Sequence, residues 1–271
     1  MLEVDKMEPL ILIIAAGEGK RLRPLTENTP KPFIDIGDKK LIDLVMEPLP
    51  QGIERAVLLK RTKKFHELEK YLRQSYGFSD GNVLYQDRIT TSPHLPRRLA
   101  LSELPLAYYL AFLPTSLSRN SRFIRQFDPV VLVPADIIVE GLNYKEMIDF
   151  HTANGADLTM PVKEEFVPGS NTRVYTVGDG RFISASDYAH PSLNMELAKN
   201  ERLYTHEGTY VLGRRFFDLP LTQLLRKDHR KPPFEGAYRS LKFVPYGGNF
   251  EWIDVRDMNN LERARQRYGR K

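Results

Sequence analysis

The feature that most constrains the fold is a continuous apolar run that leads into a glycine-rich turn. Leu10–Ala15 contains no polar residue, and Gly17 and Gly19 follow it closely. A strand that is apolar on both faces is typical of a parallel sheet whose two faces are covered by helices. The sequence therefore predicts an α/β fold that opens with a buried strand of a parallel sheet.

The rest of the first half alternates short apolar runs with amphipathic segments, as strand–helix units do. Further strands are predicted at Ala56–Leu59, Val83–Tyr85, Pro129–Pro134 and Ala156–Val162, and helices at Leu41–Pro48, Lys63–Tyr76 and Asn143–Asn154. Pro129–Val162 is thus predicted to form one strand–helix–strand unit, with the right-handed connection usual in such units.

The later part of the chain has a more antiparallel pattern. Asp179-Gly180 predicts a hairpin turn between strands at Arg173–Gly178 and Arg181–Ser186. Other strands are predicted at Leu203–Leu212, Lys242–Pro245 and Glu251–Val255, and helices at Leu219–Arg226 and Met258–Tyr268. The length of 271 residues suits one large domain.

Composition excludes several classes of protein. The chain has no cysteine, so disulfides and cysteine-held metal centres are excluded. Leu10–Ala16 is too short to cross a bilayer, which needs about 20 residues, and the acidic start is unlike a signal peptide. We therefore expect a cytoplasmic protein with no membrane partner. The net charge of +5 is mild. Without a basic stripe interleaved with aromatic residues, it favours polyanionic small molecules over nucleic acid.

The glycine turn does not match the two familiar phosphate-binding motifs. The dinucleotide fingerprint requires a third glycine three residues after Gly19, where the chain has Leu22. The P-loop requires a Ser or Thr after Gly-Lys, and Gly19-Lys20 is followed by Arg21. Both motifs are therefore excluded, although exposed backbone N–H groups in such a turn can still cradle phosphates.

Two cationic side chains accompany the turn. Arg21 can bind phosphate oxygens as a fork, and Lys31 can act as a point charge. Lys31 stands between Pro30 and Pro32, which restrict the local backbone and so hold the lysine in place. This arrangement suits a triphosphate. The competing interpretation is a tight turn with two surface bases, which does not require a lysine between prolines.

With these residues the chain resembles a known family. The pattern Gly-x-Gly-x-Arg-Leu-x-Pro-Leu-Thr, followed by Pro-Lys-Pro, an apolar strand at Phe33–Ile36 and a helix, is similar to the sugar-1-phosphate nucleotidyltransferases, or NDP-sugar pyrophosphorylases. The match runs over Leu10–Pro48. The resemblance implies a Rossmann-like nucleotidyltransferase fold, with a mostly parallel central sheet and a smaller antiparallel sugar-binding part. It implies a single domain over residues 1–271, with a nucleotide-binding half at about 1–165 and a sugar-binding and lid half at about 166–271.

The resemblance also implies an activity and a set of site residues. The activity is transfer of an NMP group from an NTP to a sugar 1-phosphate, with Mg²⁺ as cofactor and release of pyrophosphate. The implied residues are Arg21 and Lys31 for catalysis; Ala16, Gly17, Gly19 and Gln86 for the nucleotide; Glu207 and Tyr210 for the sugar; and Asp136 and Asp254 for the metal.

The two aspartates have different support from the sequence. Asp136 comes just after a predicted buried strand, where ligands bind in open α/β sheets, although a turn or cap residue would look the same. Asp254 lies in Glu251–Val255, which resembles the family's second metal-binding strand. We expect these distant carboxylates to converge on one cation, because carboxylate oxygens are preferred ligands of Mg²⁺.

Two stretches depart from the family pattern. Ser102–Tyr109 carries bulky residues where the family has a turn rich in Gly and Ala, and Ser184–Tyr188 lacks the lysine of the family's Glu-Lys-Pro. Two alternatives therefore stay open: a regulatory subunit that binds nucleotide without turnover, and a cytidylyltransferase that acts on a non-sugar phosphate. The arginine-rich end of the chain is typical of a solvated helix face and is also compatible with a homo-oligomer.

Overall fold

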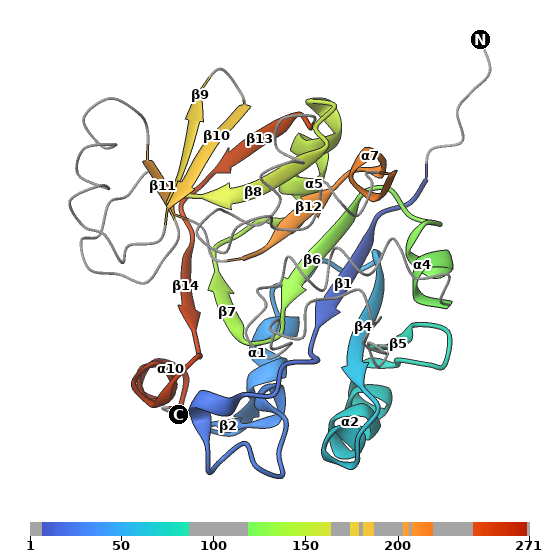
Figure 1. The fold of residues 1–271 in the computed structure, drawn as a ribbon. Coiled ribbons are helices and arrows are strands. Elements are labelled where there is room, and N and C mark those ends of the chain that lie inside the picture. Colours follow the sequence, from blue (N-terminus) through green and yellow to red (C-terminus); the bar gives the residue numbers. More distant parts are fainter. Residues whose placement is uncertain are drawn as a thin grey trace, which may run out of the picture. The chain divides into compact units, whose positions relative to one another are not determined.

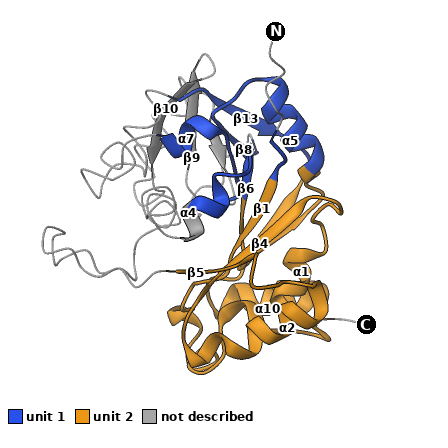
Figure 2. Cartoon of the chain, turned by 90° about the vertical axis from the view of Figure 1, so that its right-hand side faces the viewer, with its two compact units in different colours: residues 1–9, 104–131, 145–249 blue, residues 10–103, 132–144, 250–271 orange. Residues whose placement is uncertain are grey.

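The computed structural model describes residues 7–86, 119–163, 174–178, 181–186, 203–205, 208–218 and 241–269. The chain divides into two compact units (Figure 2). Unit 1 comprises residues 1–9, 104–131 and 145–249, and unit 2 comprises residues 10–103, 132–144 and 250–271. Both units are built from segments that are far apart in the sequence. Within the described ranges, none of the helices is long and apolar enough to cross a membrane.

Unit 2 contains the first parallel strands of the chain (Figure 1). Its strands are β1 (Leu10–Ile14), β2 (Asp35–Ile36), β3 (Lys39–Lys40), β4 (Glu54–Lys60), β5 (Val83–Gln86), β7 (Ile137–Glu140) and β14 (Glu251–Asp254). Its helices are α1 (Leu41–Met46), α2 (His66–Tyr76) and α10 (Met258–Tyr268), with the short 3₁₀ turns η1 (Lys20–Leu22), η2 (Lys31–Phe33) and η3 (Lys63–Phe65). β1 pairs in parallel with β4, and β4 with β5.

Unit 1 carries the antiparallel hairpin. Its strands are β8 (Leu158–Val162), β9 (Val174–Gly178), β10 (Arg181–Ser186), β11 (Leu203–Thr205), β12 (Tyr210–Leu212) and β13 (Phe243–Gly247). Its helices are α4 (Arg119–Ile124), α5 (Tyr144–Ala153) and α7 (Arg214–Asp218). β9 and β10 form the predicted hairpin, and β11 pairs on the other side of β9. β6 (Val130–Pro134) contains the point at which the chain passes from one unit to the other.

The main sheet has seven strands in the order β13-β8-β12-β6-β1-β4-β5 and is mostly parallel. The α/β class is therefore confirmed, together with smaller antiparallel sheets. β1 is apolar throughout because both its faces are covered, and Leu10–Ile13 are fully buried. α10 begins where predicted, because the Asp257 carboxylate accepts a hydrogen bond from the Asn260 N–H at 3.0 Å.

Three predictions of secondary structure were wrong in detail. The connection between β6 and β8 contains the additional strand β7, and β12 lies between β6 and β8 in the sheet. Leu203–Leu212 is divided into β11 and β12, which belong to different sheets. Phe33–Ile36 is not one strand, because Phe33 closes the turn η2 and only Asp35–Ile36 pairs with β3. The helix predicted at Leu219–Arg226 and the stretch at Ser102–Tyr109 lie outside the described residues.

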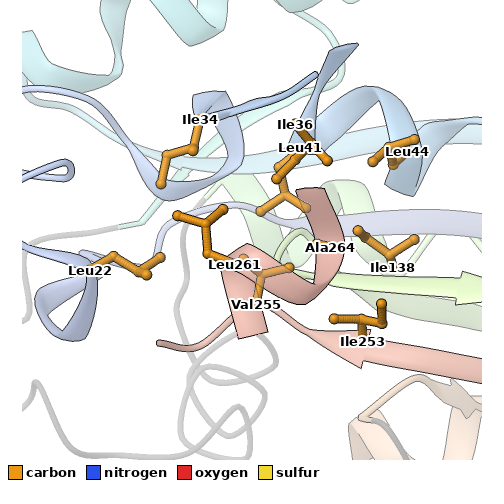
Figure 3. Packing of buried hydrophobic residues seen from close by; sticks show 10 residues of the cluster. All are labelled: Leu22, Ile34, Ile36, Leu41, Leu44, Ile138, Ile253, Val255, Leu261 and Ala264. Atoms are coloured by element: carbon orange, nitrogen blue, oxygen red, sulfur yellow. The ribbon is translucent and has the colours of Figure 1, made fainter. Parts of the chain in front are cut away.

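A buried apolar cluster in unit 2 joins the segments that carry the predicted site residues (Figure 3). The cluster consists of Leu22, Ile34, Ile36, Leu41, Leu44, Ile138, Ile253, Val255, Leu261 and Ala264. Leu22 follows Arg21 in sequence, and Ile253 and Val255 flank Asp254. Packing of these side chains therefore fixes the backbone from which the polar groups of the site project.

Candidate active site

Lys31 and Asp136 form a close ion pair. Lys31 belongs to η2, and of its flanking prolines Pro30 is extended before the turn and Pro32 lies within it. The Lys31 Nζ atom donates to Asp136 Oδ2 at 2.6 Å. The lysine side chain is 7% exposed and the aspartate side chain 41% exposed. A buried ammonium requires such a partner. The ion pair therefore holds the Lys31 side chain in place, in addition to the restriction of its backbone by the two prolines.

Asp254 lies beside this pair because β14 pairs with β7. The two strands are antiparallel, with Asp254 opposite Ile137, and the Val255 N–H donates to the Asp136 carbonyl oxygen at 3.0 Å. Burial, together with the nearby charge of Asp136, raises the pKa of Asp254 to about 6, against the opposing effects of Lys31 and Arg256. The tertiary fold thus brings together the two aspartates that the sequence singled out.

The two carboxylates of Asp136 and Asp254 form a set of oxygen ligands that fits a hard divalent cation. Two carboxylates held close together repel each other when both are ionised, and a cation would relieve that repulsion. Among the residues that the structure describes, no group of three or more Asp, Glu, His or Cys side chains could hold a metal. Two carboxylates leave most coordination positions to water and substrate phosphate oxygens, which is the usual arrangement for Mg²⁺.

The glycine-rich turn presents unpaired backbone donors. Ala15 still takes part in the sheet, since its N–H donates to the Leu58 carbonyl oxygen at 3.0 Å. From Ala16 to Arg21, by contrast, no backbone N–H donates to any group in the described part of the chain. Successive free N–H groups in a turn favour an anion, so this segment is a candidate phosphate-binding loop.

Gly19 connects this loop to Lys31. Its φ of +68° is a left-handed conformation that favours glycine. A Cβ atom built at Gly19 would lie 2.9 Å from Thr26 Cγ2 and 3.1 Å from Lys31 Cβ. At Gly17, by contrast, a Cβ atom would meet no described residue beyond its chain neighbours within 4 Å. Gly19 is therefore required by packing within the protein, whereas Gly17 leaves open space beside the loop.

Arg21 stands at the end of the loop, in η1. Its side chain is exposed, while the next residue, Leu22, is fully buried and anchors the turn. In the described residues the guanidinium has neither a hydrogen bond nor an ion pair. It is therefore available to a ligand.

Gln86 ends β5, next to Lys60 at the end of β4. Its side-chain oxygen Oε1 is buried and accepts no hydrogen bond from the described part of the protein. A buried amide oxygen without a donor is costly, and it marks a group that a ligand or water can satisfy. The position agrees with the predicted contact to a nucleobase, which stays a prediction.

The two predicted sugar-binding residues are less informative. Tyr210 lies in β12 of unit 1 and is 4% exposed, and Glu207 lies outside the described residues. Their role stays a prediction. Thr26 was missed, although it is part of the Leu-Thr pair of the motif. Its hydroxyl donates to the Gly19 carbonyl oxygen at 2.6 Å, and the residue is fully buried.

Comparison with known proteins identifies relatives. A model of the family described as nucleotidyl transferase matches residues 10–168. Glucose-1-phosphate adenylyltransferase of Geobacter metallireducens is 27% identical over 213 residues, which are 76% of this chain and 48% of the relative. That of Albidiferax ferrireducens is 29% identical over 206 residues, 74% of this chain and 46% of the relative. The chain thus spans about half the length of the curated relatives it matches.

Solved structures share the fold. A Bacillus anthracis protein assigned as a glucose-1-phosphate thymidylyltransferase, in complex with sucrose, superposes with a TM-score of 0.65 at 16% identity, covering 97% of this chain and 96% of the other. HddC of Yersinia pseudotuberculosis gives a TM-score of 0.60 at 18% identity, covering 96% and 99%. Since the family model matches more than half of the chain, and the loop and fold agree with it, the chain belongs to the nucleotidyl transferase family.

Proposed function

We propose that this protein transfers an NMP group from an NTP to a sugar 1-phosphate, forming an NDP-sugar and releasing pyrophosphate. The observation that carries the proposal is the meeting of Lys31, Asp136 and Asp254 beside a loop whose N–H groups have no partner among the described residues. These groups combine positive charge for phosphates with carboxylates for a cation, as nucleotidyl transfer requires.

The reaction needs little proton transfer. A phosphate oxygen of the sugar 1-phosphate is already an anion, so it can attack the α-phosphorus of the NTP without a general base. A bond forms between that oxygen and the α-phosphorus, and the bond to the oxygen that bridges the α- and β-phosphates breaks. The leaving pyrophosphate takes the electron pair. Catalysis then depends on positioning and on stabilisation of negative charge.

Each of these residues would have a separate role in binding or catalysis. The backbone N–H groups from Gly17 to Arg21 bind phosphate oxygens, and the Arg21 side chain stabilises the β- and γ-phosphates. Lys31 stabilises the α-phosphate. Asp136 and Asp254 would hold Mg²⁺, which supplies charge neutralisation at the reacting phosphates when it is bound. Gln86 would bind the base edge with its amide, which offers both a donor and an acceptor.

The substrate class rests partly on the relatives. The curated relatives are named glucose-1-phosphate adenylyltransferases, and one structural neighbour is named a glucose-1-phosphate thymidylyltransferase. Both names contain a hexose 1-phosphate, and they differ in the base. We therefore propose a sugar 1-phosphate acceptor and leave the base to the assay. We further propose a cytoplasmic, single-domain enzyme with Glu207 and Tyr210 on the sugar side and with a homo-oligomeric form as one option.

The deciding experiment measures pyrophosphate release. The purified chain is incubated with Mg²⁺, each common NTP including dTTP, and a panel of hexose 1-phosphates, with Asp136→Asn as the inactive control. We expect release with one NTP–sugar pair and none in the control. Nucleotide binding without release would instead support the regulatory subunit. Release only with CTP and a polyol or alcohol phosphate would support the non-sugar cytidylyltransferase.

A further inference from the structure

Lys64 stands on the connection after β4, within η3, and contacts the phosphate-binding loop. Its neighbour Phe65 is 2% exposed and anchors the turn η3 in the core. The Lys64 side chain is half-buried, and burial lowers its pKa from the ordinary value. Placing an ammonium in such surroundings costs free energy unless it is well paired, so its contacts identify what it does.

The Lys64 Nζ atom hydrogen-bonds two backbone carbonyl oxygens, one within the loop and one in the segment that follows it. It donates to the Glu18 carbonyl oxygen at 2.9 Å and to the Thr26 carbonyl oxygen. The Thr26 hydroxyl in turn donates to the Gly19 carbonyl oxygen at 2.6 Å. Lys64 and Thr26 together therefore hold two successive carbonyl groups of the loop, those of Glu18 and Gly19.

These bonds also orient the donors that follow. In a trans peptide the carbonyl oxygen and the next N–H point in opposite directions. The cis peptides in the described chain are Arg23-Pro24 and Asp128-Pro129, so the peptides after Glu18 and Gly19 are trans. Holding the Glu18 and Gly19 carbonyls on one side therefore turns the N–H groups of Gly19 and Lys20 to the other side.

Those N–H groups are among the donors without a partner in the described part of the chain. We propose that Lys64, with Thr26, is a positioning residue that presents the Gly19 and Lys20 N–H groups to the phosphates of the NTP. This inference rests on the proposed function. Lys64 acts through the backbone, and its own ammonium is occupied by the two carbonyls, so it is distinct from Arg21 and Lys31.

The test compares Lys64→Met with Lys63→Met. Lys63 is the adjacent exposed lysine, and its side chain makes no hydrogen bond or ion pair within the described residues, so its substitution removes an equal charge from the same turn. The probes are inorganic tripolyphosphate and ATP, both with Mg²⁺, measured by titration calorimetry. We expect Lys64→Met to weaken tripolyphosphate binding about tenfold, the loss that follows from one or two strong hydrogen bonds. We expect Lys63→Met to bind like the wild type.

A second variant separates the positioning of the loop carbonyl groups from the loss of the lysine charge. Thr26→Val removes the hydroxyl bond to the Gly19 carbonyl while keeping the size and charge of the side chain. We expect weaker tripolyphosphate binding with an unchanged dependence on salt, and Lys64→Arg should restore part of the affinity. In turnover assays the KM for the NTP should rise in Lys64→Met, whereas the KM for the sugar 1-phosphate should stay constant.

Several outcomes would overturn the proposal. Wild-type protein that does not bind tripolyphosphate contradicts it, and so does a folded Lys64→Met that binds like the wild type. If Lys64→Met does not fold, a Thr26→Val variant of wild-type affinity is sufficient to reject it. Wild-type protein that binds tripolyphosphate with the expected loss in the variants, but releases no pyrophosphate with any acceptor, would reject the proposed function and leave this inference standing.

Discussion

The Lys31 ammonium lies 2.6 Å from Asp136 Oδ2, and the carbonyl oxygen of the same Asp136 accepts the N–H of Val255, the residue after Asp254. Asp136 is therefore the point at which the lysine held between prolines and the strand carrying the second aspartate meet. A change of charge at Lys31, Asp136 or Asp254 should affect the other two residues electrostatically, while the surrounding apolar cluster keeps the backbone in place.

Lys31→Met should remove activity while leaving the protein folded. Methionine keeps the buried length of the side chain and removes the charge that we propose stabilises the α-phosphate. We expect a loss of about 10²-fold or more in kcat. Lys39→Met, which breaks an exposed pair with Glu47, is the matched control and should retain wild-type turnover. Normal kcat in Lys31→Met, with a circular dichroism spectrum like that of the wild type, would remove Lys31 from the mechanism.

Asp254→Asn should raise the Mg²⁺ concentration needed for half-maximal turnover. The substitution keeps the shape of the side chain and removes one of the two anionic ligands proposed for Mg²⁺. We expect an increase of about tenfold or more, because each tenfold change in affinity corresponds to about 1.4 kcal/mol and a close charge pair exceeds that value. The control is Asp257→Asn, which removes a neighbouring charge and keeps the cap of α10. An equal Mg²⁺ requirement in the two variants would argue against Asp254 as a ligand.

The two loop glycines should respond differently to alanine. The methyl group of Gly17→Ala would meet no described residue beyond its chain neighbours within 4 Å, so stability should not change, but the methyl group occupies the space beside the loop and should weaken NTP binding. Gly19→Ala should lower both stability and binding, because it adds contacts at 2.9 and 3.1 Å to an unfavourable φ.

Gly52→Ala is the control for the effect of a positive φ without added contacts. Gly52 has a φ of +80°, and a methyl group added there would meet no atom within 4 Å in the described part of the chain beyond its neighbours in sequence. Its alanine variant should therefore lose about 1 kcal/mol of stability and no NTP affinity. Thermal unfolding and nucleotide titration distinguish the three variants. A Gly17→Ala variant with full affinity would place the triphosphate away from that part of the loop.

His151 should make the stability of the protein depend on pH. Its ring is buried, Nδ1 lies 2.9 Å from Thr159 Oγ1, and burial lowers the pKa to about 4, against a smaller opposing effect of Asp157. The unfolded chain takes up the proton near pH 6.5, and the folded protein does so only near pH 4. Stability from this residue is therefore complete above pH 6.5 and falls as the pH decreases toward 4.

Urea unfolding at several pH values tests this directly. Between pH 7 and pH 4 the wild type should lose about 3 kcal/mol relative to His151→Gln, which does not titrate. The difference between the two proteins is the relevant quantity, because carboxylates elsewhere titrate equally in both. A difference that stays constant over this range would show that His151 has a pKa near its ordinary value in the folded protein.

Local patterns in the sequence were sufficient for much of the fold and part of the site. β1, β4, β5 and α10 follow from apolar runs and helical spacing, which depend on neighbouring residues alone. The glycine turn and the lysine between prolines likewise specify their local backbone. The family could be recognised for the same reason, since its motif is a short continuous stretch, and the family model that matches residues 10–168 confirms it.

The tertiary structure decided what depends on pairing between distant segments. β7 was not predicted because its short apolar run becomes a strand only through its partner β14, and Leu203–Leu212 is divided because its two ends pair in different sheets. The same β7–β14 pairing places Asp254 beside Asp136. The bonds from Lys64 to the loop arise only when β4 packs parallel to β1. The spacing of residue types along the chain determines which secondary structure forms locally, whereas tertiary packing determines which charged side chains become neighbours.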